Sequence, residues 1–133
     1  MAIRVNNIPK FKAAARAEMK RRLSRAVIEV SRHAKQLLSV PGTVAKGKGY
    51  SSRKYGSNPS RPGEPPHKQT GRLRASVAWE LVDDDTARAG TNVKYGKYLE
   101  LGTGRMKARP WLQRALTESQ SAVVRHMTAP WNP

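Results

Sequence analysis

The sequence predicts a single α+β domain, residues 1–133, in which a long N-terminal helix and a C-terminal helix pack on a small, mainly antiparallel β-sheet. Helical apolar stripes over residues 9–38 and after Pro110 predict the helices, and an alternating pattern that begins at Leu73 predicts the sheet. A long Pro/Gly-rich loop joins the first helix to the sheet. The length of 133 residues suits one domain, because single domains commonly run to about 100–150 residues.

The first helix is predicted over residues 9–38. Pro9 suits the first turn, where its missing N–H needs no partner, and Pro41 and Gly42 end the helix. The apolar residues that recur at steps of three and four are Phe11, Ala15, Met19, Leu23, Ala26, Val30, Ala34 and Leu37. About thirty residues give a helix of roughly 45 Å, so we expect one end to project from the domain.

Residues 41–69 form the predicted loop, which holds five glycines and five prolines and shows no periodicity. Such a stretch in a small domain is either a functional extended loop or a flexible surface loop. Residues 129–133 hold two prolines and predict an extended tail.

A β-hairpin region is predicted over residues 70–93. Apolar residues occupy every second position from Leu73 to Leu81, which is typical of a half-buried strand. The run Asp83 to Asp85 predicts a turn, after which Thr86 to Val93 returns as a second strand. Three adjacent aspartates also raise a metal site as an alternative, but no further carboxylate or histidine stands at ligand spacing.

Residues 94–128 combine a short helix, a glycine hinge and the C-terminal helix. Tyr95 to Leu101 predicts the short helix, and Gly102 is its expected C′ glycine. Gly102 to Arg109 is predicted to be extended, because Arg109 precedes Pro110. Pro110 then opens the last helix, whose predicted apolar face holds Leu112, Leu116, Ser119, Val123 and Met127.

The chain carries a formal charge of +17, from 26 basic and 9 acidic side chains, which predicts negatively charged partners. Residues 1–40 contribute +8, residues 41–72 contribute +6 and residues 73–133 contribute +3, so electrostatic contacts are expected in the N-terminal half. The absence of cysteine excludes disulfides, thiolate metal sites and cysteine nucleophiles. No signal-peptide pattern and no membrane span is visible, so we expect a cytosolic-type protein.

Catalytic patterns are absent from the sequence. None of the histidines, His33, His67 and His126, is coupled by its position to a serine and a carboxylate, and no two stand at metal-ligand spacing. The stretch Gly102 to Arg105 lacks the lysine and Ser/Thr of a phosphate-binding P-loop. We therefore expect no enzyme activity, metal or cofactor, and a small hydrolase is a third possibility behind the two functions given below.

Three stretches resemble a known family in their order and spacing. They are a basic amphipathic helix, SRPGEPPHKQTGRLRAS (Ser60 to Ser76) and AGTNVKYGKYLELGTGRMKARPWLQRAL (Ala89 to Leu116). The chain resembles the gene-product-ten-like family of long-tailed bacteriophages, whose members are neck, head–tail joining or tail-completion proteins. The resemblance covers residues 10–127. It departs at Trp111, where the family more often has phenylalanine, and the tail that holds Trp131 lies outside the shared pattern.

The resemblance implies a structural virion protein of the phage neck, assembled in the cytoplasm of the bacterial host as a homo-oligomeric ring of sixfold or twelvefold order. Its implied partners are further copies of itself, an adjacent connector or stopper protein, a tail-tube or tail-terminator protein, and packaged double-stranded DNA. The residues that carry the family motifs are Pro62, Gly63, Glu64, Pro65, Pro66, Thr70, Gly71, Arg72, Leu73, Tyr95, Tyr98, Glu100, Gly102, Thr103, Gly104, Arg109 and Pro110.

Several of these residues have an expected physical role. Gly102 and Gly104 are expected where backbone angles or close approach exclude a side chain, so valine at either should impair folding or assembly. Glu100 lies among five basic residues and is expected either to hold an arginine through a bidentate pair or to stay solvated. The residues expected to pack the short helix onto the sheet are Tyr95, Tyr98 and Leu99.

A basic stripe is predicted on the face of the first helix opposite its apolar stripe, and it consists of Arg21, Arg25, Ile28, Arg32 and Lys35. Such a stripe is either a solvated face or a surface that docks an adjacent ring protein or DNA phosphates. The central Ile28 and the shortage of nearby acids favour a partner.

The sequence thus predicts a ring-forming structural protein of the phage neck. The alternative, which composition alone would favour, is a cytosolic protein that binds DNA or RNA without sequence preference. No helix-turn-helix, zinc-finger or RNA-binding strand motif is visible to support sequence-specific recognition.

Overall fold

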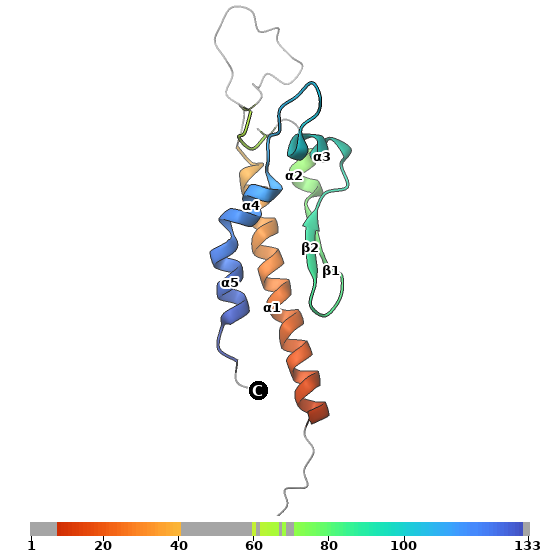
Figure 1. Ribbon diagram of the computed structural model, residues 1–133, viewed down its shortest axis with the longest axis vertical. Helices are drawn as coiled ribbons and strands as arrows, with labels where there is room; N and C mark the ends of the chain where they lie inside the picture. The colour runs from red at the N-terminus through yellow and green to blue at the C-terminus, as the bar shows by residue number, and fades with distance from the viewer. Residues whose placement is uncertain (1–7, 41–59, 61, 67, 69–70, 132–133) are drawn as a thin grey trace, which may run out of the picture.

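The computed structural model describes residues 8–40, 60, 62–66, 68 and 71–131. Its elements in order are α1 (Ile8–Leu37), α2 (Arg72–Ser76), β1 (Ala78–Leu81), β2 (Ala87–Gly90), α3 (Lys94–Leu101), α4 (Leu112–Glu118) and α5 (Gln120–Thr128). Figure 1 shows α1 as the long axis, with α4 and α5 along one side and the β1–β2 hairpin along the other. The fold is α+β, as the sequence predicts. Most of the predicted loop 41–69 and the end of the predicted tail lie outside the described residues.

Only the C-terminal half of α1 lies in the core. Its buried residues begin at Ala26, and the Nη1 of Arg22 donates to the carbonyl of Met127 at 2.8 Å, where α5 approaches its end. The predicted core positions Phe11 and Met19 are wrong, because their side chains are 54% and 40% exposed. The ring of Phe11 contacts that of Trp131 instead, with a centroid separation of 5.7 Å. The predicted projecting end is the N-terminal end of α1 (Figure 1).

The core is small and lies at the C-terminal end of α1. Trp111 is its largest fully buried side chain, at 1% exposure, and its indole Nε1 donates to the carbonyl of Gly96 at 3.1 Å. Gly96 has room only for hydrogen, since a Cβ there would lie 2.8 Å from a methyl of Leu73. The buried residues of this cluster are Ala34, Leu38, Leu73, Val77, Trp111 and Ala115.

The first half of the predicted strand is a helix. Gly71, at φ 80°, precedes α2, and the N–H of Ala75 donates to its carbonyl at 2.9 Å. Leu73 and Val77 are both buried, as the alternating pattern requires. Residues four apart share a face in a helix as well as in a strand, so the alternation could not distinguish the two over so short a stretch.

The hairpin is shorter and more exposed than predicted. β1 and β2 pair antiparallel, with Ala78 opposite Gly90 and Leu81 opposite Ala87. Trp79, an expected inward residue, is 40% exposed. The predicted turn is present: the N–H of Val82 donates to the carbonyl of Thr86 at 2.9 Å. In the part of the chain that the structure describes, the sheet has these two strands.

The predicted last helix is divided in two and begins later than expected. α4 starts at Leu112, two residues after Pro110, and Ser119 separates it from α5. On α4 the buried side chain is Ala115, whereas the predicted Leu116 is 49% exposed. The break at Ser119 changes the direction of the chain between α4 and α5, so a single apolar stripe does not run along both helices.

Candidate assembly surfaces

The two stretches that carry the resemblance meet at one end of the molecule (Figure 1). The N–H of Gly63 donates to the carbonyl of Ala108 at 3.0 Å, which ties the first motif to the second. The N–H of Arg109 donates to the carbonyl of Leu99 at 2.6 Å, so the segment after the hinge lies along the end of α3. Gly63 and Ala108, which are 45 positions apart in sequence, are therefore joined directly. Thr70 lies outside the described residues.

The glycine hinge contains one residue that needs to be glycine and one that does not. Gly102 has φ 75° and ψ 175°, and a Cβ there would stand 2.8 Å from the backbone nitrogen of Ala108. This is a region of backbone space that is essentially restricted to glycine. Gly104 has no positive φ, and a Cβ there would meet nothing within 4 Å. The expectation of backbone constraint is confirmed at Gly102 and is wrong at Gly104.

Glu100 caps the N-terminus of α4. Its Oε2 accepts hydrogen bonds from the N–H groups of Trp111 and Leu112, and its Oε1 accepts from that of Gln113, each at 2.8 Å. A carboxylate at this position also interacts favourably with the helix dipole. Neither the predicted arginine pair nor the solvated carboxylate is what the structure has. The carboxylate instead links the end of α3 to the start of α4 across the hinge.

Tyr95 and Tyr98 do not pack α3 onto the sheet. Their side chains are 40% and 52% exposed, and that of Leu101 on the same helix is 68% exposed. Leu99 packs against the core cluster, which contains no residue of the two strands, so its predicted contact is with the core and not with the sheet. The tyrosine prediction is wrong because the buried contact of α3 is made by Gly96 and Leu99, which leaves the opposite side of the helix in water.

The other motif residues divide between turns, the core and the surface. Thr103 and Met106 exchange backbone hydrogen bonds of 2.8 and 3.3 Å, so the stretch predicted to be extended contains a tight turn. Leu73 and Pro66 are buried, and Glu64 is exposed. The motif residues whose side chains or backbone lie at the surface or half-buried are Pro62, Gly63, Pro65, Gly71, Arg72, Thr103, Arg109 and Pro110.

All five residues of the basic stripe are exposed, as the sequence predicts. Two of the cations have an acidic neighbour on the same helix: Arg21 lies 3.0 Å from Glu18, and Arg32 lies 2.5 Å from Glu29. Ile28, at the centre of the stripe, leaves 43% of its side chain in water. The stripe is therefore an accessible surface on which two of the four positive charges are paired with a glutamate of the same helix.

A groove adjoins the stripe and adds residues that the sequence did not single out. It has a volume of about 410 Å³ and lies where α1 faces α2 and β1. Trp79 of β1 and Arg74 of α2 contribute to it. In the sequence, these two residues stand out only as members of the alternating segment that begins at Leu73. We call this site the basic groove, and its lining residues are Ile28, Ser31, Arg32, Lys35, Gln36, Ser39, Arg74 and Trp79.

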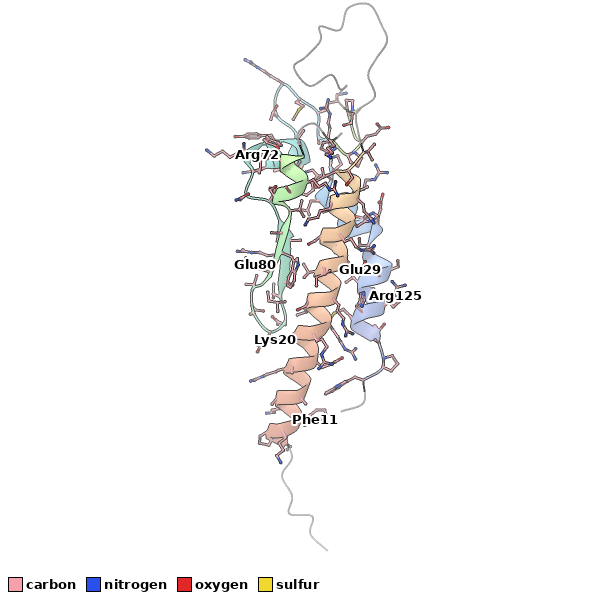
Figure 2. The ribbon with its side chains drawn as sticks, turned by 180° about the vertical axis from the view of Figure 1, so that it is seen from behind. Phe11, Lys20, Glu29, Arg72, Glu80 and Arg125 are labelled. Atoms are coloured by element: carbon pink, nitrogen blue, oxygen red, sulfur yellow. The ribbon has the colours of Figure 1, made fainter. Side chains whose placement is uncertain are left out.

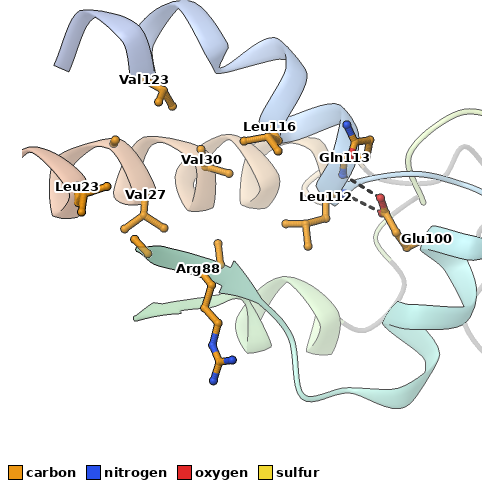
Figure 3. Close-up of a pocket in the computed structure, with 12 residues that line it drawn as sticks. Leu23, Val27, Val30, Arg88, Glu100, Leu112, Gln113, Leu116 and Val123 are labelled. Carbon is orange, nitrogen blue, oxygen red and sulfur yellow. Dashed lines mark hydrogen bonds between the residues drawn. The ribbon is translucent and has the colours of Figure 1, made fainter. Parts of the chain in front are cut away.

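A second groove is apolar and has a volume of about 420 Å³. Figure 3 shows side chains of α1, β2, α4 and α5 around it, with Glu100 at the end where it caps α4. Its polar lining residues are Arg88, Glu100 and Gln113. We call this site the apolar groove, and its apolar lining residues are Leu23, Ala26, Val27, Val30, Ala87, Ala89, Leu112, Leu116 and Val123.

A hydrogen bond between His33 and Glu118 joins α1 to α4, and ion pairs lie within each of these helices. The carboxylate of Glu118 lies 2.6 Å from His33 Nε2 and 2.7 Å from Arg114 Nε. These hydrogen bonds, that of Arg114 first, hold the pKa of Glu118 below its ordinary value. A hydrogen bond from Arg22 lowers the pKa of Glu18 in the same way.

The described residues contain no group of three or more histidine, aspartate or glutamate side chains arranged to hold a metal ion. Among the helices of the described ranges, none is both long and apolar enough to cross a membrane.

Comparison with known proteins returned no relative of this chain: no family model, no curated protein and no solved structure matches it.

Proposed function

We propose that the protein is a structural subunit of a bacteriophage neck, where copies of the chain form a ring at the junction between head and tail. Further copies of itself, adjacent neck and tail proteins and the passing genome would be its partners. The role is that of a structural element in assembly.

The observation that carries this proposal is the amount of large apolar surface beside a small core. The buried hydrophobic residues of the described chain are nine, and three of these are alanines. Leu101, Tyr98, Val124 and Leu116 leave about half or more of their side chains in water. Leu116 also lines the apolar groove, whose nine apolar lining residues gather in one place, and gathered apolar surface of this kind marks interaction sites on folded proteins. A ring subunit would bury such surface against its neighbours.

The arrangement of the motifs supports the same proposal. The motif segments meet through the Gly63–Ala108 hydrogen bond at one end of an elongated molecule (Figure 1). The two motif segments therefore lie next to each other in the folded chain. A ring subunit needs two different contact surfaces that close by rotation, and an elongated shape separates them.

The proposal is tested by the mass and shape of the purified protein. Sedimentation velocity and electron microscopy at about 0.1–1 mM chain should find closed rings with a central channel. Because apolar burial contributes to such a contact, the rings should persist when salt is raised to about 1 M, where the Debye length falls to about 3 Å. A protein that stays monomeric over this range would contradict the proposal.

A second candidate function, binding of DNA or RNA through phosphates, is favoured by the exposed basic stripe. In the described residues, Lys35 and Arg25 have no ion pair of 4.0 Å or less with a carboxylate. Phosphate binding through such residues releases counterions, so affinity for a DNA duplex should fall by orders of magnitude between 50 and 200 mM salt. Affinity that is insensitive to salt would count against this candidate.

A further inference from the structure

The basic groove is built to receive an anion. Arg32, Lys35 and Arg74 line it, and no carboxylate does. In the described residues, Lys35 and Arg74 have no ion-pair partner, whereas Arg32 is held by Glu29. Unpaired cations that converge on one concave surface attract a negatively charged group and repel a positive one.

A buried hydroxyl in the same groove also lacks a partner. Ser31 lines the groove and is 5% exposed, and its Oγ has no hydrogen-bond partner. Leaving a buried polar atom unsatisfied is unfavourable, so a ligand atom that bonds to this hydroxyl would be stabilised in the groove. Beside it stand two exposed apolar side chains, Ile28 and Trp79. The groove therefore suits an acidic group that carries an apolar neighbour.

The chain carries a segment with this chemistry at the tip of its own hairpin. The hairpin tip, Val82 to Asp85, holds three of the nine acidic residues of the protein. Val82 is 52% exposed beside them. Hydrogen bonding with Asp85 also lowers the pKa of Asp83 below its ordinary value. The tip combines an exposed aliphatic side chain with carboxylates, as the groove requires.

The tip cannot enter the groove of its own chain. Asp84 lies 3.0 Å from Lys20. Lys20 and the groove residue Lys35 are fifteen positions apart on α1, which is about 22 Å at the rise of a helix. Figure 2 shows Lys20 near the hairpin turn, well along α1 from the end that carries α2. A basic groove that receives this tip must therefore belong to another copy of the chain.

We propose that the hairpin tip of one copy, Val82 to Asp85, docks into the basic groove of the next copy. Val82 packs between Ile28 and Trp79, and the carboxylates of Asp83 and Asp85 face Lys35 and Arg74. The contact joins two different surfaces, so it leaves a free tip and a free groove at the two ends of every dimer. This inference rests on the proposed ring and identifies one of its subunit contacts.

A charge exchange tests the contact. The tip variant carries Asp83→Lys and Asp85→Lys, and the groove variant carries Lys35→Glu and Arg74→Glu. Each alone should weaken self-association by roughly 100-fold or more, since close charge pairs at interfaces couple strongly. An equimolar mixture should regain association, because the intact tip of one variant meets the intact groove of the other and the two reversed surfaces also attract. A matched control, Lys12→Glu with Arg16→Glu, makes the same change of charge at two positions of α1 outside the groove and should assemble as wild type.

A cross-link tests the contact without relying on the reversed charges. The chain has no cysteine, so Asp85→Cys together with Gln36→Cys introduces the only pair. Oxidation of the assembled protein should give a ladder of covalent multimers on a non-reducing gel, and each single-cysteine variant should give at most dimers.

The outcomes separate this contact from the ring itself. Rings that form normally from both charge variants, with no cross-linked ladder, overturn the docking contact and leave the ring in place. A wild-type chain that stays monomeric at about 1 mM overturns both. A groove variant that assembles normally but loses affinity for a 20-mer DNA duplex identifies the groove as a phosphate site and overturns the docking contact.

Discussion

At the scale of single residues, one glycine and one carboxylate determine the geometry of the glycine hinge. Gly102 adopts a backbone conformation closed to other residues, and the carboxylate of Glu100 holds three backbone N–H groups of the following helix. Together they set the direction in which the chain leaves α3 and enters α4. The presence of Gly102 and Glu100 in this stretch is therefore explained by the local backbone.

The glycine hinge gives a paired prediction. Gly102→Ala should lower the free energy of unfolding by about 2 kcal/mol or more, because a strained backbone costs about 1–3 kcal/mol and the Cβ also meets Ala108. Gly104→Ala should stay within about 0.5 kcal/mol of wild type, as surface substitutions do. Urea denaturation of the two variants measures the difference. Equal stability of the two proteins would refute the backbone argument.

Glu100 gives the second prediction. Glu100→Ala leaves three N–H groups at the start of α4 without their acceptor and should destabilise the protein by about 1–3 kcal/mol. Glu100→Gln, which keeps one side-chain oxygen, should lose less. Glu80→Ala is the control, since Glu80 pairs with Arg88 at the exposed hairpin and such pairs contribute at most about 1 kcal/mol. If Glu80→Ala is as damaging as Glu100→Ala, the cap is not the source of the effect.

At the scale of elements, α1 is held by different contacts along its length. Its C-terminal half meets the core through Ala34, next to Leu38 just after the helix, and its middle is joined to α5 by Arg22. The pair of His33 and Glu118 connects α1 to α4. Short helices such as α4 depend on these tertiary contacts, because isolated helices of seven residues are not stable in water.

The ion pairs of α1 and α4 predict an acid-dependent loss of stability. The pKa of Glu118 is lowered in the folded protein, so the unfolded chain takes up this proton first as the pH falls. The stabilisation is present above the ordinary pKa of 4.5 and is lost as the pH falls through the lower folded value. The free energy of unfolding of wild type should therefore decline below pH 4.5, and Glu118→Gln should show a shallower decline. Denaturation curves between pH 3 and 6 measure both, and parallel curves would contradict the assignment.

At the scale of the whole molecule, the small core and the two grooves make a subunit whose apolar surface is incompletely covered. The apolar groove is walled by α1 and β2 and by the helices α4 and α5 (Figure 3). The basic groove lies where α1 faces α2 and β1. Two chemically different concave surfaces on one elongated chain suit an assembly in which each copy touches several neighbours.

A substitution in the apolar groove tests whether this surface serves assembly. Leu116→Ser should weaken self-association by roughly tenfold or more, which corresponds to about 1.4 kcal/mol per contact. The stability of the monomer should change little, because Leu116 is already 49% exposed. Leu116→Met keeps the apolar volume and should assemble as wild type. Sedimentation equilibrium gives the association constants, and equal values for the serine and methionine variants would exclude the groove from the interface.

The sequence by itself determined the features that depend on local torsion and periodicity. It predicted the long α1, the turn at Asp83 to Asp85, the short α3 and the special backbone of Gly102. These follow from residues close together in the chain, because apolar spacing, turn-forming aspartates and a helix-ending glycine act over one or two turns.

The tertiary structure decided which surfaces are buried and how distant segments are capped. Residues 72–76 are helical although their alternation allowed a strand, and Ser119 interrupts the last helix. Phe11 and Tyr98 carry aromatic rings at helical spacing, yet they are 54% and 52% exposed, and the ring of Phe11 meets Trp131 and not the core. Glu100 caps a helix that begins twelve residues later. Burial and capping depend on which elements come together in space, and periodicity along one segment does not contain that information.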